Sequence, residues 1–422
     1  MPGHDDHGVP AVRHLAQGLL TLMAEITFWC SVALVLYAYL GYPCALTALS
    51  FFRDRPVKKA ETGDQPPRVS FIITAHNEEA RIREKIENTL GQDYPPAALE
   101  IIVASDCSTD RTDDIVSEYS GRVRLVRAAE RRGKEAAQQL ALQSASGEIL
   151  IFSDVATALA SDGVSGMVAS FADPTVGCVS SVDRFVDAGG RVSGEGAYVR
   201  YEMFLRGLES RVNGLVGLSG SFFAARREVC RRWAADRQSD FNTLLNAVEM
   251  GLRGVLDVRT AGYYRDIADG RRELERKVRT VVRGMFVLAT NARMLNPLRY
   301  GLFAWQLASH KLCRWLVPLA MIGAAASNVL LASGSPFYGA MLLLQGGFYA
   351  AALAGLWTGA PILRIPAYLF LANLGVLMAW LRFTRGERIA MWSPSERLAT
   401  LPAAGRRFAV RMASTPPEQS AS

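Results

Sequence analysis

Three aspartates are the residues of this chain whose type and setting point most directly to chemistry. Asp106 ends the strand-like run EIIVASD, Asp154 ends the run ILIFSD, and Asp240 opens the segment DFNTLL. No basic residue stands beside Asp154 in the sequence, and an unpaired carboxylate at a sheet edge calls for a metal ion or a ligand. A cationic and aromatic cluster, KLCRW at 311–315, leads into an apolar block. Together these features predict chemistry on a charged substrate at a membrane surface.

Each of these features also has a purely structural interpretation. Asp106 lies in DCSTD, where Ser108 or Asp110 can cap a following helix, and such turn chemistry needs no ligand. Asp240 can be the N-cap of a helix that starts with 241–245. Arginine and tryptophan at a membrane boundary can serve only as anchors. The local sequence leaves both interpretations open in each case.

Two charge-free stretches, 26–52 and 316–363, stand out in a chain that is half hydrophobic. The first exceeds the roughly 20 residues that a membrane helix needs, so we predict one anchor there. A cleaved signal peptide is the alternative, but the preceding HDDH segment is not a basic n-region and the apolar stretch is too long. The second stretch divides at SGSP into two passes, 315–332 and 338–356, and a further apolar run covers 365–381. The sequence thus contains four candidate spans.

Basic residues are distributed unevenly around the first candidate span. Arg13 is the only Lys or Arg before it, whereas Arg53, Arg55, Lys58 and Lys59 follow it. The positive-inside rule therefore places the large middle region in the cytoplasm of a multi-pass cell-membrane protein. The same rule prefers the arginine-rich tail inside, although three C-terminal spans would export it. Either one apolar segment is interfacial or re-entrant, or the rule is overridden.

From residue 68 onward, short apolar runs alternate with charged, helix-like segments. Strands are predicted at 69–74, 100–104, 123–126 and 148–152, and helices at 78–90, 112–119 and 134–144. This alternation predicts an α/β domain whose mainly parallel sheet is covered by helices. In such sheets ligands bind beyond the carboxyl ends of the strands, which is where Thr74, Asp106 and Asp154 fall.

Seven segments, taken in order, carry a resemblance to a known family. They are VSFIITAHNEE (69–79), EIIVASDCSTD (100–110), GK (133–134), FSD (152–154), SGSFFAARR (219–227), SDF (239–241) and KLCRW (311–315). This set resembles the membrane-bound family-2 inverting glycosyltransferases, the group that includes hyaluronan, chitin and cellulose synthases. The resemblance implies a GT-A fold, a Rossmann-like α/β catalytic domain that binds a nucleoside diphosphate sugar with a divalent cation, together with α-helical transmembrane segments.

The resemblance also implies roles on the donor side of the reaction. Ala75, Glu78 and Asp106 would contact the uridine and ribose of a UDP-sugar, and Lys134 would lie near the base or the phosphates. Asp154 would hold Mg²⁺ or Mn²⁺ against the diphosphate, because hard cations prefer oxygen ligands and stabilise the negative charge of the leaving group.

On the acceptor side, Asp240 matches the position of the family's catalytic base. It would take the proton of the acceptor hydroxyl as that oxygen attacks the anomeric carbon from the opposite face, so the configuration inverts. Lys311, Arg314 and Trp315 match the Q/R-x-x-R-W element of the membrane synthases. Arg314 can form a bidentate contact with phosphate oxygens, and Trp315 can stack on a sugar ring.

The sequence departs from the family pattern at three positions. Ala156 stands where the D-x-D motif has its second carboxylate, so metal binding is weakened or completed from elsewhere. Ser239 replaces the acidic residue that usually precedes the base. Lys311 keeps a positive charge at the first position of Q/R-x-x-R-W but lacks the planar amide or guanidinium group of Gln or Arg. This difference weakens the expectation of repeated chain extension.

These observations predict a membrane-bound inverting glycosyltransferase that transfers a sugar from a UDP-sugar to a polysaccharide or glycan acceptor in cell-surface glycan synthesis. Two alternatives stay open: a single-transfer enzyme with a lipid acceptor, and a catalytically inactive subunit that binds nucleotide or glycan. A nucleic-acid partner gains little support from the net charge of +7, which arginines flanking the membrane segments partly explain. The six scattered cysteines form no C-x-x-C pair and fit a reducing compartment.

The predicted organisation follows from these patterns. Its parts are an N-terminal polar segment (1–25), an anchor (26–52), a linker (53–67), a cytoplasmic GT-A domain (68–295), an interfacial segment (296–315), a C-terminal membrane region of two to three spans (316–381) and a basic, partly disordered tail (382–422). A basic helical stripe near the end of the domain is predicted to lie on lipid phosphates. It consists of Arg276, Lys277, Arg279 and Arg283.

Overall fold

The computed structural model of the protein describes residues 8–60, 65–186, 197–265 and 270–387. The chain divides into two compact units. The sheet unit comprises Leu46–Glu273 and Arg283–Phe303, and the helical unit comprises Met1–Ala45, Leu274–Val282 and Ala304–Glu387, each within its described residues.

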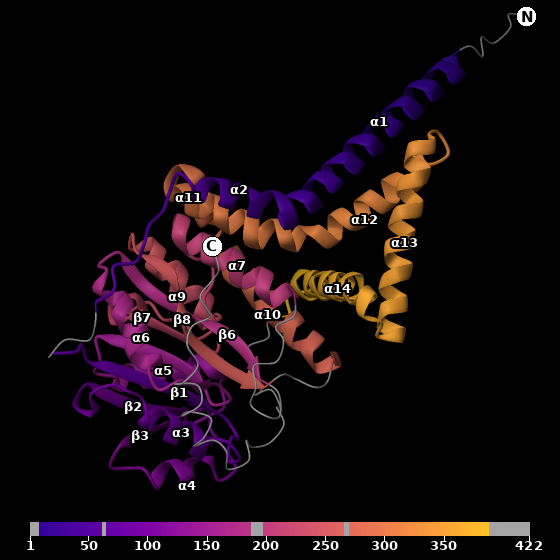
Figure 1. Cartoon of the computed structure of the whole chain (residues 1–422). Coiled ribbons are helices and arrows are strands. Elements are labelled where there is room, and N and C mark those ends of the chain that lie inside the picture. The colour runs from indigo at the N-terminus through magenta and orange to yellow at the C-terminus, as the bar shows by residue number, and fades with distance from the viewer. Residues whose placement is uncertain (1–7, 61–64, 187–196, 266–269, 388–422) are drawn as a thin grey trace, which may run out of the picture. The chain divides into compact units, whose positions relative to one another are not determined.

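The sheet unit is built on one mixed, mostly parallel sheet (Figure 1). Its strands are β1 (Val69–Ala75), β2 (Leu99–Ser105), β3 (Val123–Arg127), β4 (Ile149–Asp154), β5 (Ala158–Leu159), β6 (Val176–Val186), β7 (Phe222–Arg226) and β8 (Arg253–Arg265). They lie in the order β3-β2-β1-β4-β7-β6-β8-β5. Strands β3, β2, β1 and β4 are parallel to one another, whereas β7 is antiparallel to both β4 and β6. The predicted α/β fold is confirmed, with an antiparallel strand inserted in the middle.

Helices cover both faces of this sheet. They are α3 (Ile82–Leu90), α4 (Thr112–Ser117), α5 (Lys134–Ser144), α6 (Gly163–Ala169), α7 (Ala197–Val212), α8 (Arg227–Cys230) and α9 (Ser239–Glu249). A further helix, α10 (Gly270–Thr290), follows β8, and its residues 274–282 belong to the helical unit. Phe71 and Ile73 of β1 belong to one core with residues of α3, α4 and α6, whereas Ile72 belongs to a second core with residues of α5, α8 and α9. Because successive side chains point to opposite faces, a strand covered on both sides is mostly apolar, and all seven residues of β1 are buried.

A stack of three aromatic rings stabilises the second core. The ring of Phe152 in β4 lies 4.8 Å from that of Phe223 in β7 and 5.1 Å from that of Trp233, with interplanar angles of 18° and 20°. Each pair of this kind adds about 0.5–1.5 kcal/mol to the burial of its surface. The stack joins the central parallel strand to the antiparallel strand and to the segment that precedes α9.

One predicted helix begins later than the sequence pattern indicates. The apolar spacing predicts a helix over 78–90, but α3 begins at Ile82. The residues between β1 and α3 form a loop in which Asn77 has a φ of +51° and the backbone N–H of Glu78 donates to Thr112 Oγ1 at 2.7 Å. A hydrogen bond to Thr112, the first residue of α4, thus holds the chain where the sequence pattern predicted the first helical turn.

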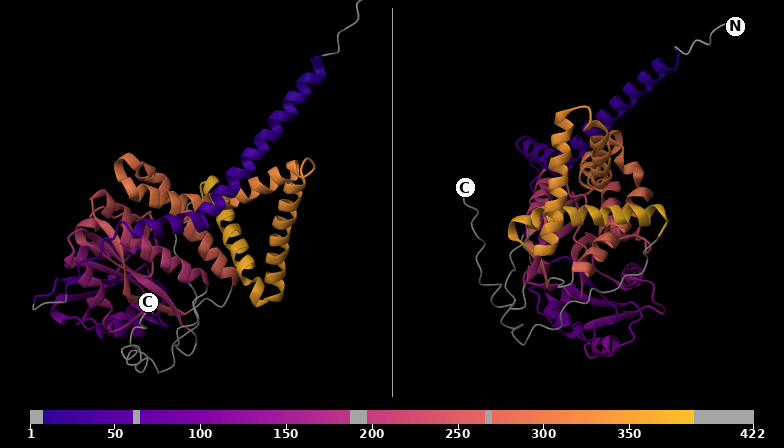
Figure 2. Two further views of the ribbon diagram at one scale, coloured as in Figure 1. Left: turned by 45° about the horizontal axis from the view of Figure 1, so that its top comes forward. Right: turned by 90° about the vertical axis from the view of Figure 1, so that its right-hand side faces the viewer.

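The long apolar helices belong to the helical unit, except that residues 46–50 and 297–303, at the ends of two of them, belong to the sheet unit. These are α1 (Gly8–Leu36), which continues through a π-helical turn, Tyr37–Gly41, into α2 (Tyr42–Ser50); α11 (Pro297–Leu307), which continues through a second π-helical turn, Ala308–Cys313, into α12 (Arg314–Leu331); α13 (Pro336–Thr358); and α14 (Arg364–Thr384). Within this unit α1 packs along α12, and α12, α13 and α14 follow one another at sharp turns (Figure 2). An edge-to-face contact between Phe28 and Tyr338, with ring centroids 5.3 Å apart, belongs to this packing.

Four helical segments among the described residues are long and apolar enough to cross a membrane: Leu15–Ser50, Pro297–Leu331, Pro336–Thr358 and Pro361–Thr384. Their number and order match the four predicted spans. The first begins upstream of the predicted start at residue 26, because the helix continues through Glu25. The segment predicted to be interfacial, 296–315, overlaps the first part of the second candidate span, Pro297–Leu331, and its place at the interface stays a prediction. From residue 388 the predicted basic tail lies outside the described residues.

Candidate active site

Asp154 is the last residue of β4, at the carboxyl edge of the parallel strands. Its backbone N–H donates to the carbonyl of Ser221 at 3.0 Å. Its carboxylate accepts from the ammonium group of Lys134, which also donates to the Gly220 carbonyl at 2.9 Å. The prediction that this carboxylate is unpaired is therefore wrong. Lys134 is the first residue of α5, so the fold brings in a cation that the neighbouring sequence does not show.

The donor set around Asp154 fits a divalent cation only in part. The described residues contain no group of three or more His, Cys, Asp or Glu side chains that could hold a metal ion. Mg²⁺ commonly binds through one or two carboxylates together with substrate phosphates, so one carboxylate suits a cation held jointly with a diphosphate. Lys134, the present partner of that carboxylate, is a compact cation that can equally neutralise phosphate charge.

Asp240 lies in the first turn of α9, and its side chain is 8% exposed. The N-cap of α9 is Gln238, so the interpretation of Asp240 as a helix cap is wrong. The amide of Gln238 donates to Asp240 Oδ2 at 3.2 Å. A Cβ atom built on Gly220 would lie 3.2 Å from the same oxygen. Gly220 therefore adjoins both the Asp240 carboxylate and the Lys134 ammonium, and it brings the two predicted aspartates into one site.

The electrostatic surroundings of Asp240 favour its use as a base. Burial raises the pKa of its carboxyl group above the ordinary value of 3.8, and the positive charges of Lys134 and Arg283 lower it only in part. A carboxylate with a raised pKa binds a proton more strongly than a solvated one. It is consequently a better acceptor for the proton of a hydroxyl group.

Asp106 and Ala75 lie at the ends of neighbouring strands, where the Asp106 N–H donates to the Ala75 carbonyl at 2.9 Å. Asp106 is fully buried, and its two carboxylate oxygens accept from the backbone N–H groups of Arg132 and Gly133, each at 2.9 Å. Gly133 has a φ of +96°, a conformation that glycine adopts readily. Asp106 thus fixes the loop that precedes Lys134, and its contact with a nucleoside stays a prediction.

Glu78 lies in the loop after β1 and is almost fully buried. Its carboxylate pairs with the Arg81 guanidinium, with an N···O distance of 2.6 Å. Burial raises the pKa of Glu78 to about 7, although the Arg81 charge and hydrogen bond oppose this shift. The predicted contact between Glu78 and a nucleoside likewise stays a prediction.

Sequence reasoning missed a polar network on the strand next to β7. Asp183 in β6 accepts from Ser219 Oγ at 2.6 Å and from Ser221 Oγ at 3.1 Å. Ser219 N–H donates to Ser180 Oγ, which also accepts from the Arg206 guanidinium at 2.6 Å. The motif SGSFF carries both of the serines that bind Asp183, but the position of Asp183 depends on the pairing of β6 with β7.

Lys85 is a second residue that sequence reasoning missed. It lies in α3, is 2% exposed, and donates to Ser153 Oγ at 2.7 Å and to the Thr157 carbonyl at 2.6 Å. Burial lowers the pKa of Lys85 to about 7, and the negative charge of Asp154 opposes this shift. A signal was present in the sequence, because Lys85 lies beside Ile82 and Ile86 on the apolar face of a short helix.

One member of the predicted basic stripe has a different role from the expected one. The Arg283 guanidinium pairs with the Glu135 carboxylate at 2.6 Å, and both side chains are largely buried. The prediction that Arg283 lies on lipid phosphates is therefore wrong, because a neighbouring helix provides its anion. The same Glu135, which directly follows Lys134 in the chain, accepts at its backbone carbonyl from Trp233 Nε1 at 2.9 Å.

The predicted acceptor cluster belongs to the helical unit. Lys311 lies in the π-helical turn, and Arg314 and Trp315 begin α12. One guanidinium nitrogen of Arg314 lies 3.0 Å from Nε2 of His310. The Trp315 carbonyl accepts from Trp380 Nε1 at 2.8 Å. Within their own unit these residues hold helices together, and their role toward an acceptor stays a prediction.

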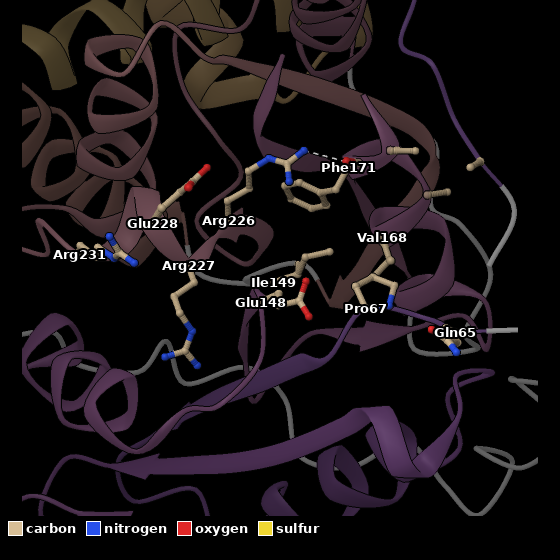
Figure 3. A pocket seen from close by; sticks show the side chains of 13 residues that line it. Gln65, Pro67, Glu148, Ile149, Val168, Phe171, Arg226, Arg227, Glu228 and Arg231 are labelled. Atoms are coloured by element: carbon tan, nitrogen blue, oxygen red, sulfur yellow. Dashed lines mark hydrogen bonds between the residues drawn. The ribbon is translucent and has the colours of Figure 1, made fainter. Parts of the chain in front are cut away.

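A cavity of about 540 Å³ lies at the opposite edge of the sheet, beside Pro67 and Glu148 at the amino ends of β1 and β4 (Figure 3). Arg226 donates to the Phe171 carbonyl at 2.7 Å and lies over the ring of the same residue. Arg227 donates to two further backbone carbonyls. These guanidinium groups are engaged in holding loops together, so this cavity is not part of the candidate site.

Comparison with known proteins gives a consistent result. Residues 70–233 match the family model described as "Glycosyl transferase family 2". The probable glycosyltransferase YdaM of Bacillus subtilis is 34% identical over 112 residues, which are 25% of this chain and 26% of that protein. The beta-monoglucosyldiacylglycerol synthase of a Nostoc species is 26% identical over 200 residues, 45% of this chain and 42% of that protein. The chain thus matches less than half the length of these relatives.

A solved structure shares the fold. The mannosyltransferase PcManGT from Pyrobaculum calidifontis, determined in complex with GDP-Man and Mn²⁺, superposes with a TM-score of 0.70, covering 86% of this chain and 99% of that chain at 24% sequence identity. At this level of identity the likeness concerns the fold alone. The sheet order, the placement of Asp154 at the end of β4 and the family match agree with one another. Residues 70–233 therefore match the glycosyltransferase family 2 model, and the chain has a GT-A-like fold.

Proposed function

We propose that this protein is a membrane-bound inverting glycosyltransferase that transfers a sugar from a UDP-sugar to a polysaccharide or glycan acceptor in cell-surface glycan synthesis. The observation that carries the proposal is the convergence of Asp154, Lys134 and Asp240 around Gly220 in a family-2 domain. The four apolar helices support the membrane assignment. By the positive-inside rule the sheet unit is cytoplasmic, on the side where nucleotide sugars are made.

The residues of the sheet unit divide the reaction between them. Asp240 takes the proton of the acceptor hydroxyl, and burial of its carboxylate makes it the stronger base. Lys134 neutralises charge on the diphosphate that leaves. Asp106 keeps Lys134 in place by holding the loop before it, and with Ala75 and Glu78 it lines the region of the nucleoside. When bound, Mg²⁺ or Mn²⁺ supplies Lewis-acid stabilisation of the leaving diphosphate, and Asp154 would hold it.

The acceptor side is assigned to Lys311, Arg314 and Trp315. The resemblance of this segment to Q/R-x-x-R-W supports a place for the chain near the hyaluronan, chitin and cellulose synthases. An aromatic face suits a sugar ring, and a guanidinium suits an anionic group next to it. Replacing Trp315 by leucine, which keeps the apolar volume but removes the stacking face, should raise the KM for the acceptor and leave the KM for the donor unchanged.

The test is a donor screen on the detergent-purified full-length protein. A panel of UDP- and GDP-sugars is supplied with membrane extract as the acceptor source, and released nucleoside diphosphate is measured with and without EDTA. We expect release from one UDP-sugar, loss of release with EDTA and recovery with excess Mn²⁺. Indifference to EDTA would remove the metal role of Asp154, and absence of release from every donor would refute the proposed function.

A second function, single transfer to a lipid acceptor, is favoured by one observation. A relative with 26% identity over 200 residues is named a beta-monoglucosyldiacylglycerol synthase. Labelled donor distinguishes the two functions, because one sugar on an organic-extractable product indicates a lipid acceptor, whereas a long product indicates polymerisation. Turnover by the wild-type protein would also eliminate the alternative of an inactive binding subunit.

A further inference from the structure

The segment that follows Asp154 is held by one face of helix α3 and by a residue just beyond the end of that helix. Lys85 and Asn88 are spaced i and i+3, so their side chains lie on the same face of α3, and Gln92 follows the C-cap residue Gly91. Asn88 exchanges two hydrogen bonds with the backbone of Leu159, at 2.9 and 3.0 Å. Gln92 donates to the Ala160 carbonyl at 2.9 Å and accepts from the Val164 N–H at 3.1 Å. These contacts tie the segment to α3 along its length.

Lys85 makes the contact nearest to Asp154, and it does so on both sides of that residue. Its ammonium group donates to Ser153 Oγ at 2.7 Å and to the Thr157 carbonyl at 2.6 Å. Ser153 Oγ in turn donates to the Asp154 carbonyl at 3.3 Å, and the Thr157 N–H donates to the same carbonyl at 3.2 Å. Both routes from Lys85 therefore lead to the backbone of Asp154.

The choice of a lysine at this position has a chemical reason. An amide side chain offers one donor group and one acceptor, which suits the contacts of Asn88 and Gln92 with backbone groups of both kinds. The two groups that Lys85 reaches both act as acceptors, and an ammonium group offers three donors and no acceptor. The remaining side of the ammonium faces the ring of Phe71, with the nitrogen 5.3 Å from the ring centroid. Lys85 is consequently matched to this place despite the cost of burying a charge.

From this geometry we propose that Lys85 is a positioning residue for Asp154, and that it sets the affinity of the site for a divalent cation bound together with a nucleoside diphosphate. The inference rests on the proposed function. The positioning of Asp154 matters in this chain because Ala156 replaces the second carboxylate of the usual pair. The orientation of a single carboxylate therefore decides the affinity for the cation. Changes to residues that orient a metal ligand typically cost about 10–100-fold in metal affinity.

The experiment measures binding of Mn²⁺ to the full-length protein in detergent with uridine diphosphate present, by calorimetry and by the loss of free Mn²⁺ signal in electron paramagnetic resonance. The variants are Lys85→Met, which keeps the side-chain length and removes the donors, and Asn88→Leu as the matched control. Asn88 lies on the same face of α3 and holds the same segment, but its contact is at Leu159. Thermal unfolding of each variant is recorded in parallel.

We expect Lys85→Met to weaken Mn²⁺ binding by about 10–100-fold and Asn88→Leu to change it less than about twofold, while both variants lose thermal stability. Ser153→Ala provides a second approach, because it removes one of the two routes and leaves Lys85 in place. Its effect on Mn²⁺ binding should disappear in the Lys85→Met background, since contacting residues of one network are not additive.

Four results would overturn the inference. Equal weakening by Lys85→Met and Asn88→Leu would show that any loosening of the segment suffices, and unchanged or tighter Mn²⁺ binding by Lys85→Met would show that Asp154 needs no such support. If the effects of Lys85→Met and Ser153→Ala on Mn²⁺ binding were fully additive, the two residues would act independently on Asp154. Failure of the wild-type protein to bind Mn²⁺ at all would overturn the proposed metal role as well, so the two failures are distinguishable.

Discussion

Replacing Asp240 by asparagine separates the chemistry of the candidate site from the stability of the sheet unit. The substitution keeps the size of a side chain that is 8% exposed, and it keeps an oxygen that can accept from Gln238, whose amide now lies 3.2 Å from Oδ2. It removes the carboxylate that we propose takes the acceptor proton. A positioned general base contributes about 10²–10⁴-fold, so kcat should fall by that factor, equivalent to about 3–5 kcal/mol in the barrier.

The thermal stability of the Asp240→Asn variant should equal or exceed that of the wild-type protein. Because burial raises the pKa of Asp240, the folded state binds its proton more tightly than the unfolded state does. The resulting stabilisation is fully present below the ordinary value of 3.8 and is lost as the pH rises through the raised pKa. Above that pH the wild-type protein holds an unfavourable charge that asparagine lacks. The variant should therefore unfold at the same temperature as the wild type or at a higher one.

The assay is the release of nucleoside diphosphate at saturating donor, measured across pH and accompanied by thermal unfolding. Asp236→Asn is the control, since it makes the same exchange at a carboxylate whose side chain is 71% exposed. In the wild type, activity should rise with pH through a midpoint above 3.8. Retention of more than about a tenth of wild-type kcat by Asp240→Asn would refute the assignment of the base, because even the smallest expected loss is about 10²-fold.

Two further predictions concern the surroundings of the site, and a third concerns Asp173, which pairs with Arg253 away from the site. Lys134→Met should leave Asp154 unpaired, raise the KM for the donor more than tenfold in a kinetic assay, and lower the free energy of unfolding by about 1–3 kcal/mol, less than for a fully buried pair because Asp154 is partly exposed. Asp106→Asn should destabilise the sheet unit by about 1–3 kcal/mol in denaturant unfolding, because its amide NH₂ would face a backbone N–H. For Asp173, burial raises the pKa but hydrogen bonds from Thr175 and others lower it to about 2. Its stabilising contribution is thus present above 3.8 and lost as the pH falls toward about 2, and the unfolding midpoint of Asp173→Asn should lack this dependence.

The alternating pattern of the sequence predicted the parallel part of the fold. The strands β1, β2 and β4 are largely apolar runs buried on both faces, which is the pattern of a sheet covered by helices on both sides, whereas β3, at the edge of the sheet, is only partly buried. The insertion of β7 between β4 and β6 could not be predicted in this way. Strand pairing between residues far apart in the chain depends on the three-dimensional packing, and no local period records it.

For the site, the sequence located the aspartates but not their partners. Asp154 was expected to be unpaired because no cation stands next to it in the chain, yet Lys134 is brought to it by a loop that Asp106 fixes. Burial of Asp240 was similarly invisible, since a short polar segment ahead of a helix predicts an N-cap. The residues that bear charge can be read from the sequence, whereas the residues that orient them, such as Lys85, need the fold.

The aromatic stack offers a spectroscopic probe of the site. Trp233 is packed against Phe152 and is the only tryptophan among the described residues of the sheet unit, and its indole N–H binds the residue directly after Lys134. A ¹⁹F-labelled indole at this position would report on the start of helix α5 through its resonance frequency. Titration with a nucleotide could then be followed in micelles without any turnover.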